Sequence, residues 1–432
     1  MTAHVKSSFA NDLPAADGGV SIRRTVKNAQ VIRRHFIVFL TISVLVYTAQ
    51  CLKLPPEKID GLLVPDSVNI AKLLDFVREG NIESSVLVES QMTGIITLYS
   101  LAWAIHPATS LLINWMLIYL SLRLTADIFT KQSANLHWIL LGVTGNPYVY
   151  LVAPAPNKEI PLLFLTLLFV YQLIVRPRWW VLYTIIISGA VYSIRDGYGA
   201  IVLIIAALHI TARRTPRIMV IVGIVVLSVC VFIDQYVADY LSFVVRNKDA
   251  INLVKTATGG ESTILGVAIS GSTDPFLNVL MYYSRIVYNV TTLGVFPIFV
   301  SIFHGCYVLG WAFWVFGILI FSGVVSCVIV VLGKQNTAAG NKRLEVAVLV
   351  LLLVAAISVS SYVQPRYLMP VLPLAGGVCM SLRLLRMKVI GSVVLLCVGV
   401  MLFYAIRGYK LPLADTSDTV NEVPSFVLGA KE

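Results

Sequence analysis

The sequence predicts an all-α polytopic membrane protein with about 11 transmembrane helices, in a range of about 10 to 12. Three observations indicate this class: 58% of the 432 residues are hydrophobic, only 13% are charged, and the mean hydropathy is +0.84. A water-soluble domain of this composition would expose large apolar patches. Apolar runs of about 17 to 25 residues recur from Phe36 to Ile406, and each is long enough as a helix to cross roughly 30 Å of hydrocarbon.

The apolar runs divide the chain into a basic N-terminal tail (1–34), an integral membrane domain (35–406) and a C-terminal tail (407–432). Two long outer loops cover roughly 53–107 and 234–305. Parts of these loops, 94–105 and 276–303, are apolar, but a full crossing by either would invert the later topology, so we expect amphipathic or re-entrant helices there. The expected spans are 36–52, 108–128, 135–153, 161–175, 179–194, 198–211, 217–233, 306–332, 344–361, 367–383 and 389–406.

The charged residues predict the orientation of these spans. With the N-terminus inside, every inner connection is basic, as is typical of cytoplasmic loops, whereas most acidic residues fall outside. We therefore expect a bacterial inner-membrane protein with a cytoplasmic N-terminus and a periplasmic C-terminus. The net charge of +11 then reflects topology and not a nucleic-acid partner. The inner basic residues are Lys131, Arg176, Arg178, Arg213, Arg214, Arg217, Lys334, Lys342, Arg343, Arg383, Arg386 and Lys388.

The first outer loop contains the segment PDSVNIAKLLDFVREGNI, which predicts an amphipathic helix lying along the membrane. Its apolar residues follow the i, i+3, i+4, i+7 spacing from Ile70 to Val77, and Gly80 supplies a C-terminal stop. Asp66 begins this helix. Its carboxylate either caps the helix or acts as a general base that deprotonates an acceptor hydroxyl.

The segment PAPNKEIP places Asn157, Lys158 and Glu159 at the start of the next span. Lysine and glutamate are costly at a buried helix end, and a helix N-terminus favours an anion. Lys158 and Asn157 are therefore candidates for binding a phosphate, and Glu159 is a candidate second acid or base. The alternative is a capped helix start with Lys158 extended to lipid head groups.

The segment SIRDGYG places Arg195 and Asp196 between two apolar spans, with Gly197 and Gly199 allowing a tight turn or the close approach of a ligand. An arginine here suits bidentate binding of phosphate. Equally, Arg195 and Asp196 suit a structural charge network.

The segment SSYVQPRYLMPVLPLAGG places Gln364, Arg366 and Tyr367 at the outer mouth of a span loosened by proline. A lone arginine at this level is usually an interfacial anchor. Four polar sites on one side of the membrane favour a functional role instead. Arg285 and Tyr282, in LMYYSRIVYNV, are further candidate contacts from the second long loop.

Several common catalytic motifs are absent from the sequence. It contains no Walker A loop, no GxGxxG after a strand, no HExxH and no Cys/His cluster. Nucleotide hydrolysis, dinucleotide chemistry and zinc hydrolysis therefore have no support, and we expect neither a metal site nor a cofactor.

The combination of NKE, RDG and QPRYLMPVLP, with an aspartate before an amphipathic helix in the first outer loop, resembles Wzy-type O-antigen and exopolysaccharide polymerases, within or near the GT-C-type membrane glycosyltransferases. The resemblance covers roughly residues 36–406. It implies an undecaprenyl-diphosphate-linked oligosaccharide as substrate and polymerisation of its repeat units at the periplasmic face, in O-antigen (lipopolysaccharide) or exopolysaccharide biosynthesis. It also implies the lipid bilayer, a flippase and a chain-length regulator as partners.

Carried over residue by residue, the resemblance assigns Lys158, Arg195 and Arg366 to the diphosphate, and Asp66 or Glu159 to activation of the acceptor hydroxyl. One feature departs from the wider class. Many GT-C enzymes place two adjacent carboxylates in the first loop, whereas Ser67 follows Asp66 here. A metal-assisted mechanism is therefore not expected.

Two other functions remain open. One is a GT-C-type transferase that moves a single sugar from a polyprenyl-phosphate donor. The other is a transporter of lipid-linked sugars or polysaccharide, which should show paired repeats and broken helices at the membrane midplane. The sequence shows no internal repeat, and its charged motifs are expected at the outer rim.

Overall fold

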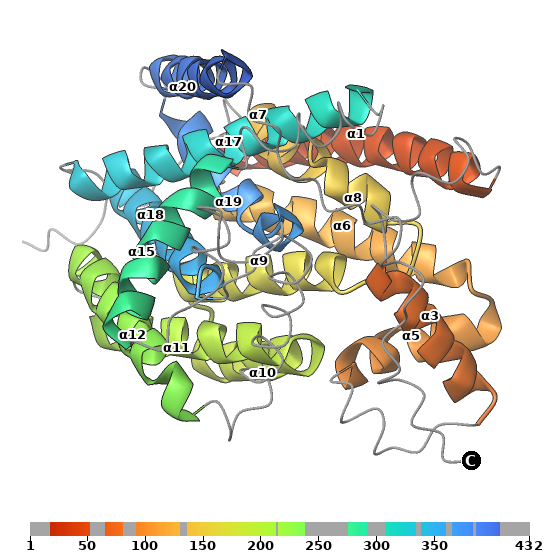
Figure 1. The fold of residues 1–432 in the computed structure, drawn as a ribbon. Helices are drawn as coiled ribbons and strands as arrows, with labels where there is room; N and C mark the ends of the chain where they lie inside the picture. Colours follow the sequence, from red (N-terminus) through yellow and green to blue (C-terminus); the bar gives the residue numbers. More distant parts are fainter. Residues whose placement is uncertain are drawn as a thin grey trace, which may run out of the picture.

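The computed structural model describes residues 18–51, 65–80, 92–129, 136–212, 215–237, 275–292, 307–333, 338–359, 365–382 and 386–406. Within these ranges the chain is helical and contains no strand, which confirms the all-α class (Figure 1). The elements are α1 (Gly18–Cys51), α3 (Pro65–Arg78), α5 (Thr93–Ile105), α6 (Thr109–Ile128), α7 (Leu136–Thr144), α8 (Pro147–Val152), α9 (Glu159–Val175), α10 (Trp180–Ile194), α11 (Asp196–Ala212), α12 (Pro216–Val237), α15 (Pro275–Thr292), α17 (Tyr307–Leu332), α18 (Ala338–Ile357), the 3-10 helix η2 (Pro365–Leu368), α19 (Leu372–Ser381) and α20 (Arg386–Ile406).

Four helices in the described ranges are long and apolar enough to cross a membrane. These segments are Lys27–Thr48 in α1, Thr109–Ile128 in α6, Pro216–Ile233 in α12 and Trp314–Leu332 in α17. Several other predicted spans are shorter apolar helices, including α9, α10, α11 and α19. The chain is thus a helical membrane protein, and the count of eleven spans stays a prediction.

Helix α10 is apolar on its exposed face and carries buried hydroxyl groups among apolar side chains on its inner face. Thr184 and Ser188 are buried, and their hydroxyls donate to the carbonyls of Trp180 and Thr184 at 2.7 and 2.8 Å. Such bonds satisfy hydroxyl groups where water is absent. The exposed large side chains of α10 are Val181, Leu182, Tyr183, Ile185, Ile186 and Tyr192. An exposed face of this composition suits a hydrocarbon solvent.

Several predicted boundaries differ from the structure, and three of these differences have a local cause. Helix α1 already begins at Gly18, inside the predicted tail, because the basic segment that follows is free of proline and rich in helix-forming residues. The predicted span 135–153 is broken into α7 and α8, since Pro147 starts a new helix and the side chain of Asn146 accepts a hydrogen bond from Tyr148 N at 3.0 Å. The predicted span 367–383 starts as η2 and becomes α-helical only at Leu372, because Pro370 has no N–H to donate.

The centre of the bundle is α19, in which every residue is buried. Figure 1 shows it near the middle of the bundle, close to α17. Glycines let its neighbours come close: a Cβ at Gly142 of α7 would lie 2.8 Å from Pro373 Cα, and one at Gly323 of α17 would lie 2.7 Å from Ala375 Cβ. The packing of α7, α17 and α19 therefore depends on the absence of side chains at these two positions.

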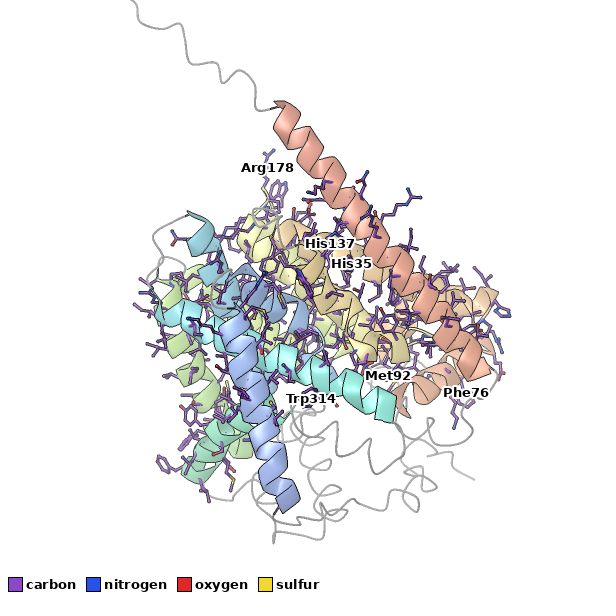
Figure 2. The ribbon with its side chains drawn as sticks, turned by 90° about the horizontal axis from the view of Figure 1, so that it is seen from above. His35, Phe76, Met92, His137, Arg178 and Trp314 are labelled. Carbon is purple, nitrogen blue, oxygen red and sulfur yellow. The ribbon has the colours of Figure 1, made fainter. Side chains whose placement is uncertain are left out.

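One end of the bundle gathers the predicted inner connections. The Arg176 guanidinium lies 3.1 Å from Glu345 Oε2 and 3.2 Å from His209 Nε2, and that of Arg217 donates to the Gly333 carbonyl. The ends of α9, α11 and α17 and the starts of α12 and α18 therefore meet here. Figure 2 shows Arg178, His35 and His137 toward the N-terminal half of α1, and Phe76 and Met92 toward its other end.

Candidate functional site

Helix α3 lies beside α5, within the segment predicted as the first outer loop (Figure 1). Ile70, Leu73 and Leu74 are buried. Gly80 follows the helix with φ +73°, the left-handed conformation that favours glycine, and its N–H donates to the Val77 carbonyl at 3.1 Å. The amphipathic helix and its glycine stop are therefore confirmed.

Asp66 lies in the first turn of α3. Its side chain falls outside the described residues, so its roles as a cap or a general base stay predictions. What the structure describes is how its helix is held. Trp103 Nε1 of α5 donates to Asp75 Oδ1 at 2.9 Å, and Asp75 also forms a 3.2 Å ion pair with Arg78. The hydrogen bond from Trp103 joins α5 to α3, whereas the ion pair lies within α3.

Helix α5 also contacts the corner between α10 and α11. A Cβ at Gly94 would lie 2.3 Å from Ser193 Oγ and 2.8 Å from the Ser193 backbone, so α5 can pack this closely only with glycine at this position. Ser193 is two residues from Arg195. The first outer loop and the SIRDGYG segment therefore meet at this end of the bundle.

A buried hydrogen-bond cluster joins α5 and α6 to the PAPNKEIP segment. The Tyr99 hydroxyl donates to Asn114 Oδ1 at 2.5 Å, while Asn114 Nδ2 donates to the carbonyls of Ala153 and Ala155 at 2.9 and 3.0 Å. Both side chains are fully buried. Burial raises the pKa of Tyr99 above its usual range, so the phenol stays protonated and can donate. Asn114 thus satisfies two carbonyls of a chain segment that leaves the helix.

Asn157 lies two residues before the start of α9 at Glu159. Its Nδ2 donates to the carbonyls of Val152 and Ala155, both at 2.8 Å, and its Oδ1 accepts the Ile160 N–H at 2.9 Å. The side chain is fully buried. The Asn157 side chain therefore bonds to the first turn of α9, in line with the alternative of a capped helix start, and its role in binding substrate stays a prediction.

The start of α9 offers fewer N–H groups to an anion than a typical helix start. The Ile160 N–H is occupied by Asn157, and Pro161 has none. An anion bound here would therefore depend mainly on the side chain of Lys158, which is half-buried. Glu159 follows and is only 5% exposed, close enough to Tyr99 for an electrostatic interaction. A carboxylate at this depth is costly unless it is used.

Arg195 and Tyr367 meet although they are far apart in the sequence. The guanidinium carbon of Arg195 lies 3.8 Å from the centroid of the Tyr367 ring. A cation above an aromatic face at this distance stabilises the contact by about 0.5 to 2 kcal/mol, depending on its exposure to water. The contact joins the α10–α11 corner to η2 and brings two of the predicted substrate-binding residues together.

The stacking leaves the hydrogen-bonding groups of Arg195 available. The guanidinium carries five N–H donors in one plane, and its central carbon lies over the ring. Among the residues that the structure describes, the guanidinium makes no hydrogen bond or ion pair, and the side chain is half-buried. A planar donor group held in this way fits two oxygens of a phosphate.

The corner that carries Arg195 is set by close packing rather than by an unusual backbone. A Cβ at Gly199 would lie 2.4 Å from Tyr192 Cα, so only glycine allows α10 and α11 to meet here. The Tyr198 hydroxyl lies 3.2 Å from Thr166 Oγ1, which joins α11 to α9. Gly199 therefore serves helix packing within α11, and the close approach of a ligand there stays a prediction.

The remaining predicted residues are placed as follows. Arg285 is 7% exposed, and its Nη1 lies 3.5 Å from the Val359 carbonyl, just past the C-terminal end of α18, where a positive charge is favourable. Tyr282 is buried and donates to the Ala355 carbonyl at 3.1 Å. Asp196 begins α11 and Arg366 lies in η2 beside Tyr367, but their side chains, like Gln364, fall outside the described residues.

Tyr99 and Asn114 were not predicted from the sequence. An asparagine within an apolar span is itself a signal, because polar side chains in membrane helices usually bond to a neighbouring helix. The sequence carries no comparable signal for Tyr99, since tyrosine is common in interfacial segments.

Comparisons with protein-family models, with curated proteins and with solved structures found no match. The structure itself describes a helical membrane protein. It has a buried polar cluster around Tyr99 and Asn114, and the guanidinium of Arg195 lies over the Tyr367 ring.

Proposed function

We propose that this chain is a membrane glycosyltransferase that polymerises undecaprenyl-diphosphate-linked oligosaccharide repeat units at the periplasmic face of the bacterial inner membrane. The observation that carries the proposal is the stacking of Arg195 on Tyr367 at 3.8 Å, with the guanidinium donors unoccupied among the described residues. A lipid-linked diphosphate supplies the oxygens that such a group binds.

The proposed reaction needs an anion-binding group and a base near each other. Arg195 binds the diphosphate of the donor, with Lys158 and Arg366 as the other cations of the site. Asp66 or Glu159 accepts the proton of the acceptor hydroxyl while its oxygen attacks the anomeric carbon. The bond between that carbon and the diphosphate breaks, and undecaprenyl diphosphate leaves. The common attachment of α3, the 153–158 segment and the α10–α11 corner to α5 supports this assignment.

The proposed orientation rests on charge. The basic connections around Arg176 and Arg217 are assigned to the cytoplasm, and the end of the bundle that carries Arg195 is assigned to the periplasm. A cysteine label introduced near each end would test this. Labelling of the Arg217 end from the periplasm would contradict it.

The length distribution of surface polysaccharide, with and without the gene, tests the function. Deletion should leave glycan of a single repeat unit, because extension stops while synthesis and export of the unit continue. Unchanged long chains would refute polymerisation. A change in sugar composition at constant chain length would indicate the single-sugar transferase, and loss of all surface glycan would indicate transport.

Substitutions separate the role of Arg195 from a general effect of losing an arginine. Arg195→Ala should abolish chain extension while the protein still inserts, and Arg195→Lys should restore little, because an ammonium neither stacks nor binds two oxygens in one plane. Arg178→Ala is the matched control. The guanidinium carbon of Arg178 also lies over an aromatic ring, 5.6 Å from the centroid of Trp179, but at the other end of α10. Full extension by Arg195→Ala would remove the diphosphate assignment.

A further inference from the structure

Two histidines meet where α1 packs against α7. His137 Nδ1 lies 3.3 Å from His35 Nε2, and Figure 2 shows the two side chains close together beside α1. The sequence separates them by 102 positions, so no local spacing of ligands predicts a metal site here. Neither residue has a part in the proposed polymerisation, and the pair is therefore a feature that this function leaves unexplained.

Thr144 holds the ring of His35. His35 Nδ1 lies 3.0 Å from Thr144 Oγ1, and that hydroxyl donates to the Leu140 carbonyl at 3.4 Å. Because the hydroxyl proton points to this carbonyl, Nδ1 of His35 carries the ring proton and Nε2 keeps its lone pair. Metal-binding histidines are commonly held in this way, with the second ring nitrogen donating to an oxygen.

The distance between the two facing nitrogens fits a tetrahedral ion. Imidazole nitrogens lie about 2.0 to 2.1 Å from Zn²⁺. Two such nitrogens 3.3 Å apart subtend an angle of about 107° at the metal, close to the tetrahedral value of ~109°. Neighbouring positions of a square-planar or octahedral ion would instead bring the nitrogens to about 2.8 to 3.0 Å.

The ion would take the place of the proton that joins the two rings. With the lone pair on His35 Nε2, the hydrogen bond between the rings is donated by His137 Nδ1. His137 is exposed, so its ring can turn toward an ion and carry its proton on Nε2, in contact with water. Both imidazoles are then neutral ligands, as zinc requires.

The charges around the pair permit a cation. Among the described residues, His137 is the titratable side chain whose charge acts on His35, and the neighbouring Arg33 and Arg34 are exposed. No third histidine, cysteine or carboxylate joins the pair in the part of the chain that the structure describes. Two positions around the ion are therefore open to water.

We propose that His35 and His137 form a binding site for Zn²⁺ that joins α1 to α7. The ligands are His35 Nε2 and His137 Nδ1, and water completes the tetrahedron. Thr144 is a positioning residue, since it fixes the tautomer of His35 and does not contact the ion. Structural zinc sites have four protein ligands. A site with two exchanges its metal with the solution, and its occupancy follows the concentration of zinc.

Zn²⁺ alone, added to the full chain purified without a histidine tag, tests the site. Excess Zn²⁺ should raise the unfolding temperature by about 2 °C or more, because an ion that binds only the folded pair stabilises the folded state. His137→Gln should remove this rise. The matched control is His106→Gln: His106 is also exposed, but its Nδ1 accepts the Ala108 N–H at 3.1 Å. That variant should keep the rise.

Two results would overturn the proposal: no rise in the unmodified chain, or an equal rise in His137→Gln, which would place the zinc elsewhere. Co²⁺ checks the geometry, because a tetrahedral cobalt ion absorbs visible light strongly and an octahedral one weakly. Strong bands that His137→Gln abolishes are expected, and weak bands would contradict the tetrahedral site. Thr144→Val should raise the zinc concentration needed for half the effect about tenfold or more. An unchanged concentration would refute the role of Thr144.

Discussion

The replacement of Asn114 by alanine tests whether the buried cluster holds the PAPNKEIP segment. The substitution removes three hydrogen bonds at once: one accepted from the Tyr99 hydroxyl and two donated to the carbonyls of Ala153 and Ala155. Asn114 is fully buried, and so is Ala153. Water therefore has little access to the groups left behind.

The expected loss follows from these contacts. A buried hydrogen bond contributes about 1 kcal/mol net, and a buried group left without its partner costs about 1 to 3 kcal/mol. Hydrogen bonds between membrane helices average somewhat less, about 0.6 to 2 kcal/mol, because the separated helices find other partners. We expect Asn114→Ala to reduce the free energy of unfolding by about 2 to 4 kcal/mol.

The assay is unfolding in mixed micelles followed by far-ultraviolet circular dichroism. Ser121→Ala is the matched control, because Ser121 is also fully buried on α6 but donates only to the Leu117 carbonyl of its own helix, at 2.7 Å. That variant should lose no more than about 0.5 kcal/mol. If Asn114→Ala and Ser121→Ala are equally stable, the cluster does not hold the segment and the reasoning is wrong.

The same assay checks three further changes. Gly199→Ala should cost about 2 kcal/mol or more, because the new Cβ meets the Tyr192 backbone and opens the α10–α11 corner. Gly80→Ala should cost about 1 kcal/mol, since φ is +73° but no atom lies within 4 Å of the new Cβ; a loss larger than that of Gly199→Ala would contradict the packing argument. Trp103→Phe should cost about 1 kcal/mol through the lost bond to Asp75, and a neutral result would show that α3 is held by apolar contacts alone.

Much of the helical layout could be predicted from the sequence. The expected spans 108–128 and 179–194 agree with α6 and α10 to within one residue. Continuous apolar runs leave the backbone no water to bond, so the chain there must form its hydrogen bonds within the segment. The amphipathic helix before Gly80 was predictable for a similar reason, because its apolar spacing and its glycine stop are local signals.

Pro147 indicates the helix break at Asn146. The apolar residues on both sides favour one continuous span, so the break was not predicted. The roles of Asn157 were left open by its neighbours in the sequence, since a cap and a ligand use the same amide. Only the packing of this segment shows that the amide bonds to the Ile160 N–H and to the carbonyls of Val152 and Ala155, and its role in binding substrate stays a prediction.

Only the tertiary structure decided which polar side chains meet. The contacts between Arg195 and Tyr367 and between Tyr99 and Asn114 depend on how closely helices approach, and that depends on positions such as Gly94, whose effect is seen only with its neighbour Ser193 in place. Local hydrogen bonding determines where this chain is helical. The pairing of its polar groups depends on the fit between surfaces that are distant in the sequence, and no local pattern records that fit.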